Sequence, residues 1–243
     1  MTNPLFYAKI LLFGEYGIIE DSQGLTLPYS FYKGALKFSS LQSDFETESN
    51  ESLKKYANYL KDLELPDAYT INISALQKDI RKGLFFDSNI PQGYGVGSSG
   101  ALVAAIFERY SIKTYLPEHI SKDELKDLKK IFGQMESYFH GKSSGIDPLI
   151  CYMNLPILIE NKENVNKVSI PQSEEGKGAI FLIDSGITGE TGPMVQIFFE
   201  KMKTEGFRKT MKEEFIRYNN ACIDAFLKKE MTPLFRNLKS LSV

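Results

Sequence analysis

The segment Pro91 to Ala101, PQGYGVGSSGA, contains the residue types that can hold a phosphate group. Glycines at 93, 95 and 97 let the backbone approach a ligand closely, and an alanine-rich helix pattern follows directly. The start of a helix offers backbone N–H groups and a partial positive charge, which together favour an anion. The spacing matches neither a P-loop nor a dinucleotide fingerprint. A plain turn in which Ser98 or Ser99 caps the helix is the alternative.

A second group of polar residues follows in the segment Glu136 to Asp147, ESYFHGKSSGID. Glu136 comes directly after Met135, an apolar position of a predicted helix, so its carboxylate lies beside the buried face and needs a partner. A divalent cation is one candidate, and a half-exposed glutamate is the alternative. Asp147 follows a loop of small residues, where a carboxylate can cap a helix or act as a base.

Alternating strand and helix patterns must position these two segments, which indicates a mixed α and β protein in layers. The clearest helix begins with a capping box, Ser121 with Glu124, and ends at His140 and Gly141. The predicted strands cover residues 8–13, 35–38, 70–73, 84–86, 152–160 and 178–184. The predicted helices cover residues 52–60, 75–82, 101–110, 121–140, 194–205 and 208–229.

Composition excludes several classes of protein. The chain has 243 residues, 42% of them hydrophobic, and a net charge of −2, so it is long enough for a core and offers no overall positive field for nucleic acid. The first residues show neither a basic leader nor a membrane-spanning run. Cys151 and Cys222 lack metal-site spacing, so we expect both to be reduced and buried in a cytoplasmic protein.

Three segments, in order, resemble the motifs of the GHMP kinase superfamily, and most closely its mevalonate kinase branch. AKILLFGEYGII, from Ala8, resembles the first motif, in which a lysine precedes a strand that ends in Gly-Glu-His. The glycine-rich segment resembles the second motif, PxxxGLGSSA, and HGKSSGID, from His140, resembles HGxPSGxD. The resemblance covers residues 7 to 200 and implies a kinase that phosphorylates the hydroxyl of mevalonate with ATP and Mg²⁺.

The resemblance also implies a fold and a set of site residues. The fold is the α+β, two-domain architecture of GHMP kinases, with a ribosomal-protein-S5-like N-terminal domain at residues 1–170 and a partial ferredoxin-like C-terminal domain at residues 171–243. Asp147 and Lys9 are the expected catalytic residues, and Ser99 and Glu136 the expected magnesium ligands. The expected nucleotide-binding residues are Gly93, Tyr94, Gly95, Val96, Gly97, Ser98 and Ser99. The expected substrate-binding residues are Glu15, Tyr16, His140, Ser144 and Thr188.

The sequence departs from the family motifs in three places. Tyr16 replaces the histidine of Gly-Glu-His, and Lys142-Ser143 replaces the usual Asn-Pro. No glycine follows Gly206, so the third motif, GxGxGG, is absent, which we interpret as truncation. The alternatives are a phosphomevalonate kinase, another GHMP small-molecule kinase, a non-catalytic nucleotide-binding protein and a structural or interaction domain. The expected partners are ATP and a mevalonate-like alcohol, without nucleic acid or membrane, and a homodimer is left open.

Overall fold

The computed structural model describes residues 3–113, 115–171, 182–184, 186–189 and 191–242. Two compact units share these residues, and we describe each one separately. Unit 1 contains the residues up to Lys9, Pro28–Pro91 and Val96–Asn154. Unit 2 contains Ile10–Leu27, Gln92–Gly95 and the residues from Leu155 onwards. Strands β1 (Phe6–Phe13) and β2 (Gly24–Phe38) therefore pass from one unit into the other.

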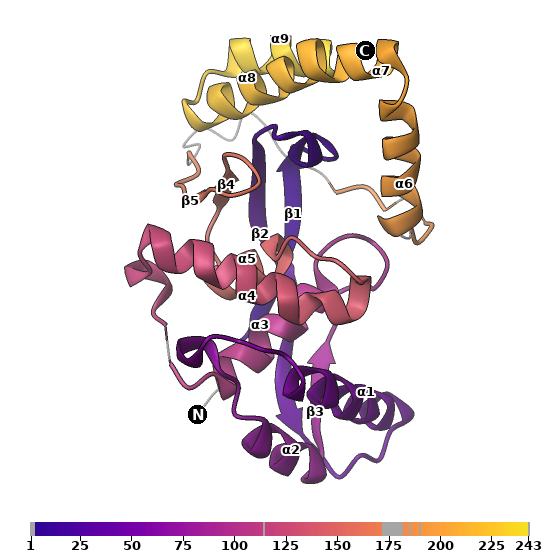
Figure 1. The fold of residues 1–243 in the computed structure, drawn as a ribbon, viewed down its shortest axis with the longest axis vertical. Coiled ribbons are helices and arrows are strands. Elements are labelled where there is room, and N and C mark those ends of the chain that lie inside the picture. The colour runs from indigo at the N-terminus through magenta and orange to yellow at the C-terminus, as the bar shows by residue number, and fades with distance from the viewer. Residues whose placement is uncertain (1–2, 114, 172–181, 185, 190, 243) are drawn as a thin grey trace. The chain divides into compact units, whose positions relative to one another are not determined.

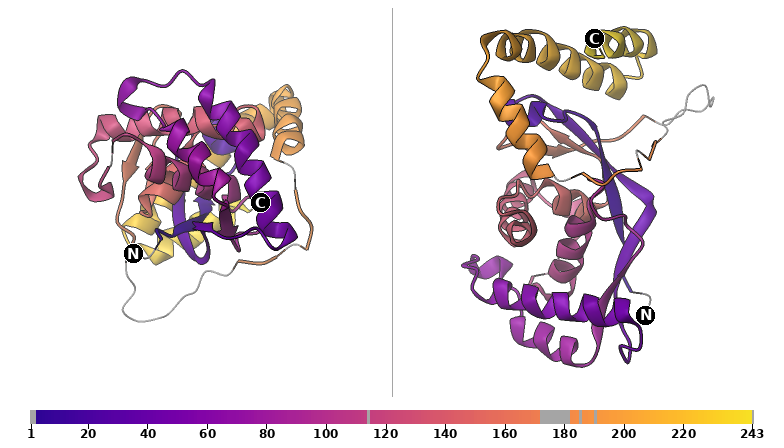
Figure 2. Two further views of the ribbon diagram at one scale, coloured as in Figure 1. Left: turned by 90° about the horizontal axis from the view of Figure 1, so that it is seen from below. Right: turned by 90° about the vertical axis from the view of Figure 1, so that its right-hand side faces the viewer.

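Unit 1 is a layer of helices packed on strands. The second half of β2 pairs antiparallel with β3 (Leu84–Ser88), with Gly34 opposite Ser88 and Phe38 opposite Leu84. In Figure 2 the helices of this unit lie on one side of the long strand β2. The helices are α1 (Asp44–Lys61), α2 (Ile73–Arg81), α3 (Ser98–Tyr110), α4 (Lys122–His140) and α5 (Ile146–Met153), with short 3-10 turns at Asp67–Tyr69 and Pro117–His119.

Aromatic rings form the centre of unit 1, where α3, α4 and α5 meet. Phe107, Phe132 and Tyr152 come one from each helix, and their ring centroids are 5.0 to 5.5 Å apart. Both phenylalanines are fully buried. Edge-on and tilted ring pairs of this kind add to the free energy gained by burial. This core therefore fixes the three helices that carry the candidate site.

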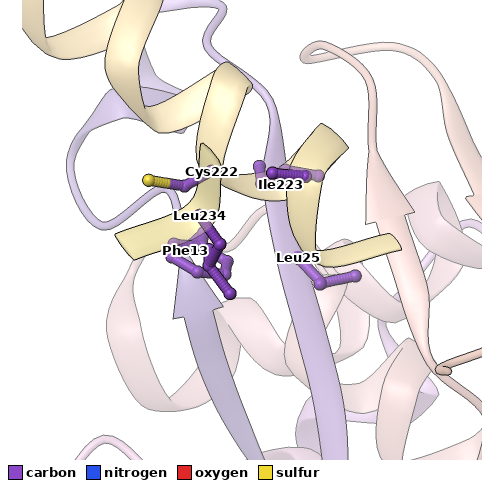
Figure 3. Close-up of a cluster of buried hydrophobic side chains, with 6 residues drawn as sticks. Phe13, Leu25, Cys222, Ile223 and Leu234 are labelled. Atoms are coloured by element: carbon purple, nitrogen blue, oxygen red, sulfur yellow. The ribbon is translucent and has the colours of Figure 1, made fainter. Parts of the chain in front are cut away.

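Unit 2 pairs helices with the other ends of the same strands. Residues 24–26 of β2 pair antiparallel with β4 (Ile157–Ile159), and β4 pairs with β5 (Val165–Lys167). Helices α8 (Ile216–Leu227) and α9 (Met231–Leu241) lie side by side in Figure 1. Figure 3 shows their Cys222, Ile223 and Leu234 with Phe13 and Leu25 of the strands in one buried cluster. The other segments are the 3-10 turn Gly17–Glu20, α6 (Thr191–Met202), α7 (Glu205–Thr210) and a π-helical stretch, Met211–Phe215.

Most of the predicted elements are confirmed, including the capping box of Ser121 with Glu124 and the end of α4 at His140. The predicted strand at 70–73 is wrong: only Ile71 makes an isolated bridge, to Ser111. The Asn72 side chain instead accepts a hydrogen bond from the Ala75 N–H and starts α2. The predicted helix at 208–229 is interrupted by the π-helical stretch.

The predicted strand at 152–160 is also wrong over its first residues, because α5 extends to Met153 and only Ile157–Ile159 form β4. All the residues of α5 except Asp147 are buried, so its apolar run has the same pattern as a buried strand. Residues 178–181 of the last predicted strand lie outside the described residues, and residues 182–184 form no strand. Both cysteines are free and buried, as expected. In the part of the chain that the structure describes, no helix is long and apolar enough to cross a membrane.

Gly145 and Gly141 allow a matched test of how tightly the loop before α5 packs on α4. Both have positive φ, +75° and +71°, but a Cβ on Gly145 would overlap the Lys129 carbonyl oxygen, whereas one on Gly141 would meet open space. We expect Gly141→Ala to lower the free energy of unfolding by about 2 kcal/mol, because a φ of +71° with a ψ of −45° is sparsely populated by residues that carry a Cβ. Gly145→Ala adds overpacking and should cost about 3 kcal/mol or more. Urea denaturation of both variants measures the difference, and equal losses would contradict the packing described.

Candidate functional site

The glycine-rich loop leads into α3 and contacts β1 through a backbone hydrogen bond. The Lys9 N–H on β1 donates to the Val96 carbonyl oxygen over 2.9 Å, within unit 1. The glycines at 93, 95 and 97 all have positive φ, as a tight loop of this kind requires. A Cβ on Gly97 would lie 2.9 Å from Lys9 Cγ, so only glycine lets the loop pass this close to the lysine side chain.

Helix α3 begins directly after the loop, with Gly97 as its N-cap. No side chain in the described part of the chain caps it, so the alternative in which Ser98 or Ser99 is the cap is wrong. The first-turn N–H groups therefore keep their partial positive charge for another acceptor. Ser99 lies in this first turn and directs its hydroxyl towards α4.

Glu136 of α4 is a buried carboxylate, with only 3% of its surface exposed. Each of its oxygens accepts a hydrogen bond from a serine of unit 1. Ser99 Oγ donates to Oε1 over 2.9 Å, and Ser143 Oγ donates to Oε2 over 2.5 Å. The helical spacing placed Glu136 beside the buried face, and the structure places it inside unit 1.

Burial raises the pKa of Glu136 to about 7, and the negative charge of Asp147 adds to this rise. The two serine donors and the Lys9 ammonium act in the opposite direction and favour the ionised form. The carboxylate is therefore under-compensated when ionised. A cation that replaced its proton would stabilise it.

Asp147 lies in the first turn of α5 and pairs with Lys9, whose Nζ is 2.9 Å from Asp147 Oδ1. Lys9 is 8% exposed, so this ion pair is more protected from solvent than a surface pair. Gly145, and not Asp147, is the N-cap of α5, so the carboxylate is not used as a cap. At Gly100 of α3 a Cβ would lie 2.7 Å from the Asp147 carbonyl carbon, so the two helices meet backbone to backbone.

His140 and Ser144, two of the expected substrate residues, also belong to unit 1. His140 Nε2 is 3.0 Å from Ser99 Oγ. Because the single Ser99 proton is donated to Glu136, this network assigns the N–H to Nε2, which donates to the serine. Ser144 Oγ accepts from the Ile146 N–H over 3.4 Å, at the start of α5. The structure thus brings both residues to the ends of the helices that carry Glu136 and Asp147.

The remaining expected substrate residues lie in unit 2. The Gly189 N–H donates to the Gly93 carbonyl oxygen over 2.9 Å, and a Cβ on Gly93 would lie 3.1 Å from Thr188 Cβ, so Thr188 contacts the first part of the glycine-rich loop. Tyr16 has an unusual φ of +58°, and its ring stacks on Phe198 with centroids 5.4 Å apart. An apolar cavity of about 210 Å³ is lined by Glu15, Tyr16, Phe198, Phe207, Thr210, Met211 and Phe215.

Two residues that contact the candidate site, Ser143 and Cys151, were not among the predicted site residues. Ser143 donates to Glu136, and its only sequence signal was that it stands in place of the proline of HGxPSGxD. Cys151 of α5 donates from Sγ to the Gly97 carbonyl oxygen over 3.8 Å, beneath the loop. Burial raises the pKa of this thiol, so it stays protonated and serves as packing.

The donor set fits magnesium better than a transition metal. Among the described residues, no group of three or more His, Cys, Asp and Glu side chains is arranged to hold a metal. Mg²⁺ prefers oxygen and takes one or two carboxylates from the protein, with phosphates and water completing its shell. A buried carboxylate beside a serine hydroxyl at a helix start supplies oxygens of this kind.

Comparison with known families gives one match. The model for the GHMP kinases N-terminal domain matches residues 53–154, a range that ends where the last segment of unit 1 ends. Over these residues the chain is therefore similar to the N-terminal domain of GHMP kinases. A sequence search of curated proteins found no match.

Solved mevalonate kinases have the same fold. The L. major enzyme in complex with R-mevalonate aligns with a TM-score of 0.60 and 13% identity, over 98% of this chain and 72% of that chain. The Methanococcus jannaschii enzyme aligns with a TM-score of 0.53 and 16% identity, over 100% of this chain and 80% of that chain. The predicted α+β fold class of the GHMP kinases is confirmed, and family and fold together support a small-molecule kinase.

The raised pKa of Glu136 predicts a specific pH dependence of stability in the metal-free protein. The folded state holds this proton up to about pH 7, and an unfolded glutamate loses it near its ordinary value of 4.5. The contribution is therefore present at pH 4.5 and is lost as pH rises towards and through 7. Full loss corresponds to on the order of 3 kcal/mol.

Urea denaturation in EDTA at pH 5.5 and pH 8 tests this prediction. The fall in unfolding free energy between the two pH values should be smaller in Glu136→Gln than in the wild type, because other titrating groups cancel in the comparison. Glu124→Gln, at a partly exposed capping position, changes a carboxylate whose pKa is lowered to about 2, and it should not reduce the fall. An identical fall in unfolding free energy in the wild type and Glu136→Gln would contradict the raised pKa of Glu136.

Proposed function

We propose that this chain transfers the γ-phosphate of ATP to the hydroxyl of a small molecule. The proposal starts from the match of residues 53–154 to the GHMP kinases N-terminal domain. Mevalonate is the proposed substrate and phosphomevalonate the product. The proposal is supported most by one observation: an ion pair, Lys9 with Asp147, and a buried serine–carboxylate pair, Ser99 with Glu136, converge on the starts of two helices.

Asp147 is the proposed base. Its carboxylate takes the proton of the substrate hydroxyl, the oxygen attacks the γ-phosphorus, and the bond from that phosphorus to the oxygen of the departing ADP breaks. The Lys9 ammonium, 2.9 Å from the Asp147 carboxylate, holds it in place and offsets the charge that develops on the phosphoryl oxygens. Phosphoryl transfer needs positioning and charge neutralisation more than covalent chemistry, and this pair supplies both.

Ser99 and Glu136 are the proposed magnesium ligands. A bound magnesium ion supplies positive charge that neutralises the phosphates of ATP. The loop residues Gly93 to Ser99 are proposed to bind those phosphates through backbone N–H groups, which is supported by the positive φ of the three glycines and the uncapped start of α3.

The choice of mevalonate is supported by the shared fold with an enzyme solved with R-mevalonate, at low identity. Glu15, Tyr16, His140, Ser144 and Thr188 are the proposed substrate residues. We also propose an N-terminal domain at 1–170 with a partial C-terminal domain at 171–243. A cytoplasmic location is proposed because both cysteines are free.

A coupled assay of ADP release with mevalonate, phosphomevalonate, homoserine and galactose tests the proposed substrate. We expect magnesium-dependent turnover with mevalonate, at a kcat/KM at least tenfold above that with the other three alcohols. Preference for phosphomevalonate or another substrate would keep the reaction type and reject the substrate. ATP binding without turnover on any of them would favour a non-catalytic nucleotide-binding protein.

Asp147→Asn should lower kcat by 1,000-fold or more and leave ATP affinity within a few-fold, because it removes the base and keeps the shape of the side chain. Asp87→Asn is the matched control, since Asp87 also pairs with a lysine, Lys37, over 2.5 Å but at a partly exposed position away from the site. The control should keep wild-type kcat. Turnover of Asp147→Asn at the wild-type rate would reject Asp147 as the base.

A further inference from the structure

We propose that Ser143 is a positioning residue for the magnesium site, and that its hydroxyl fixes the orientation in which Glu136 meets the cation. The inference rests on the proposed function, because it concerns the same site. Its basis is the short hydrogen bond from Ser143 Oγ to Glu136 Oε2, 2.5 Å long.

The two oxygens of Glu136 have separate donors, which fixes the plane of the carboxylate. Ser99 donates to Oε1 from α3, and Ser143 donates to Oε2 from the loop before α5. With 3% of the residue exposed, water has little access to replace either donor. Removal of one donor leaves the carboxylate free to turn about its terminal torsion, which is broad and has no strong preference of its own.

Ser143 is itself held in place by backbone contacts. Its Oγ accepts from the Gly145 N–H over 3.0 Å, and its own N–H donates to Ser137 Oγ over 3.3 Å. Ser137 Oγ in turn donates to the Gly133 carbonyl oxygen over 2.7 Å on α4. The hydroxyl of Ser143 therefore has a fixed position relative to the helix that carries Glu136, and its single proton is donated to the carboxylate.

A proline, the residue of the HGxPSGxD pattern at this position, has neither a hydroxyl nor an N–H group. It could make none of the three hydrogen bonds that Ser143 makes. The departure from the pattern thus lies beside the cation-binding carboxylate. In this chain Ser143 stands in place of the proline ring and bonds directly to Glu136.

Calorimetric titration of ATP into the full chain, in EDTA and in excess Mg²⁺, tests the role. The measured quantity is the magnesium enhancement, which is the Kd in EDTA divided by the Kd in Mg²⁺. Ser143→Ala should reduce this enhancement about tenfold and leave the Kd in EDTA within twofold, because the loop N–H groups bind the phosphates without Glu136. Ser143→Thr keeps the hydroxyl and should restore the wild-type enhancement within twofold.

Ser39→Ala is the matched control, because Ser39 Oγ makes the same type of turn contact, from the Leu41 N–H over 2.9 Å, away from the site. It should leave both Kd values unchanged. An unchanged enhancement in Ser143→Ala, or an equal loss in EDTA and in Mg²⁺, would overturn the positioning role, since an equal loss indicates a loop effect. Failure of the wild type to bind ATP under either condition would reject the proposed function itself, and the inference with it.

Discussion

The candidate site depends on a buried negative charge, the carboxylate of Glu136. An ionised group out of contact with water is unfavourable unless hydrogen-bond donors or an opposite charge compensate for it. The chain supplies two hydroxyls and a nearby lysine, and the pKa is still raised to about 7. This remaining deficit is the physical basis of the cation site proposed at Glu136.

Glycines stand at the N-caps of the two helices that carry Ser99 and Asp147. Gly97 before α3 and Gly145 before α5 are both N-caps with positive φ, and neither N-cap residue has a side chain that could bond the first turn. At α5 the Ser144 hydroxyl accepts from the Ile146 N–H. Helix α3 thus presents first-turn N–H groups next to Ser99, without a side-chain cap. Side-chain caps at these positions would have used the N–H groups that an anion needs.

Patterns that depend on local chemistry were predictable from the sequence. The capping box of α4 and its end at Gly141 were expected from the sequence. Lys9 and Asp147, which the family resemblance named as the catalytic residues, form an ion pair. Helix α5 was missed because a short run that is apolar all round has no amphipathic period. Ser143 was missed because its partner, Glu136, is bound through a contact that depends on how the loop turns back on α4, and sequence spacing does not determine that path.

The absent side chain of Gly100 has a consequence for how this molecule can change over evolution or in the laboratory. There α3 touches the backbone of α5 at Asp147, with no side chain between them to absorb a shift. A segment 91–101 transplanted from a relative with a bulkier residue at position 100 would overlap the Asp147 backbone and push this aspartate away from Lys9. The segment that contains Gly100 and the segment that contains Asp147 therefore need to be exchanged together. A chimera that exchanges only one of them would displace Asp147 relative to Lys9.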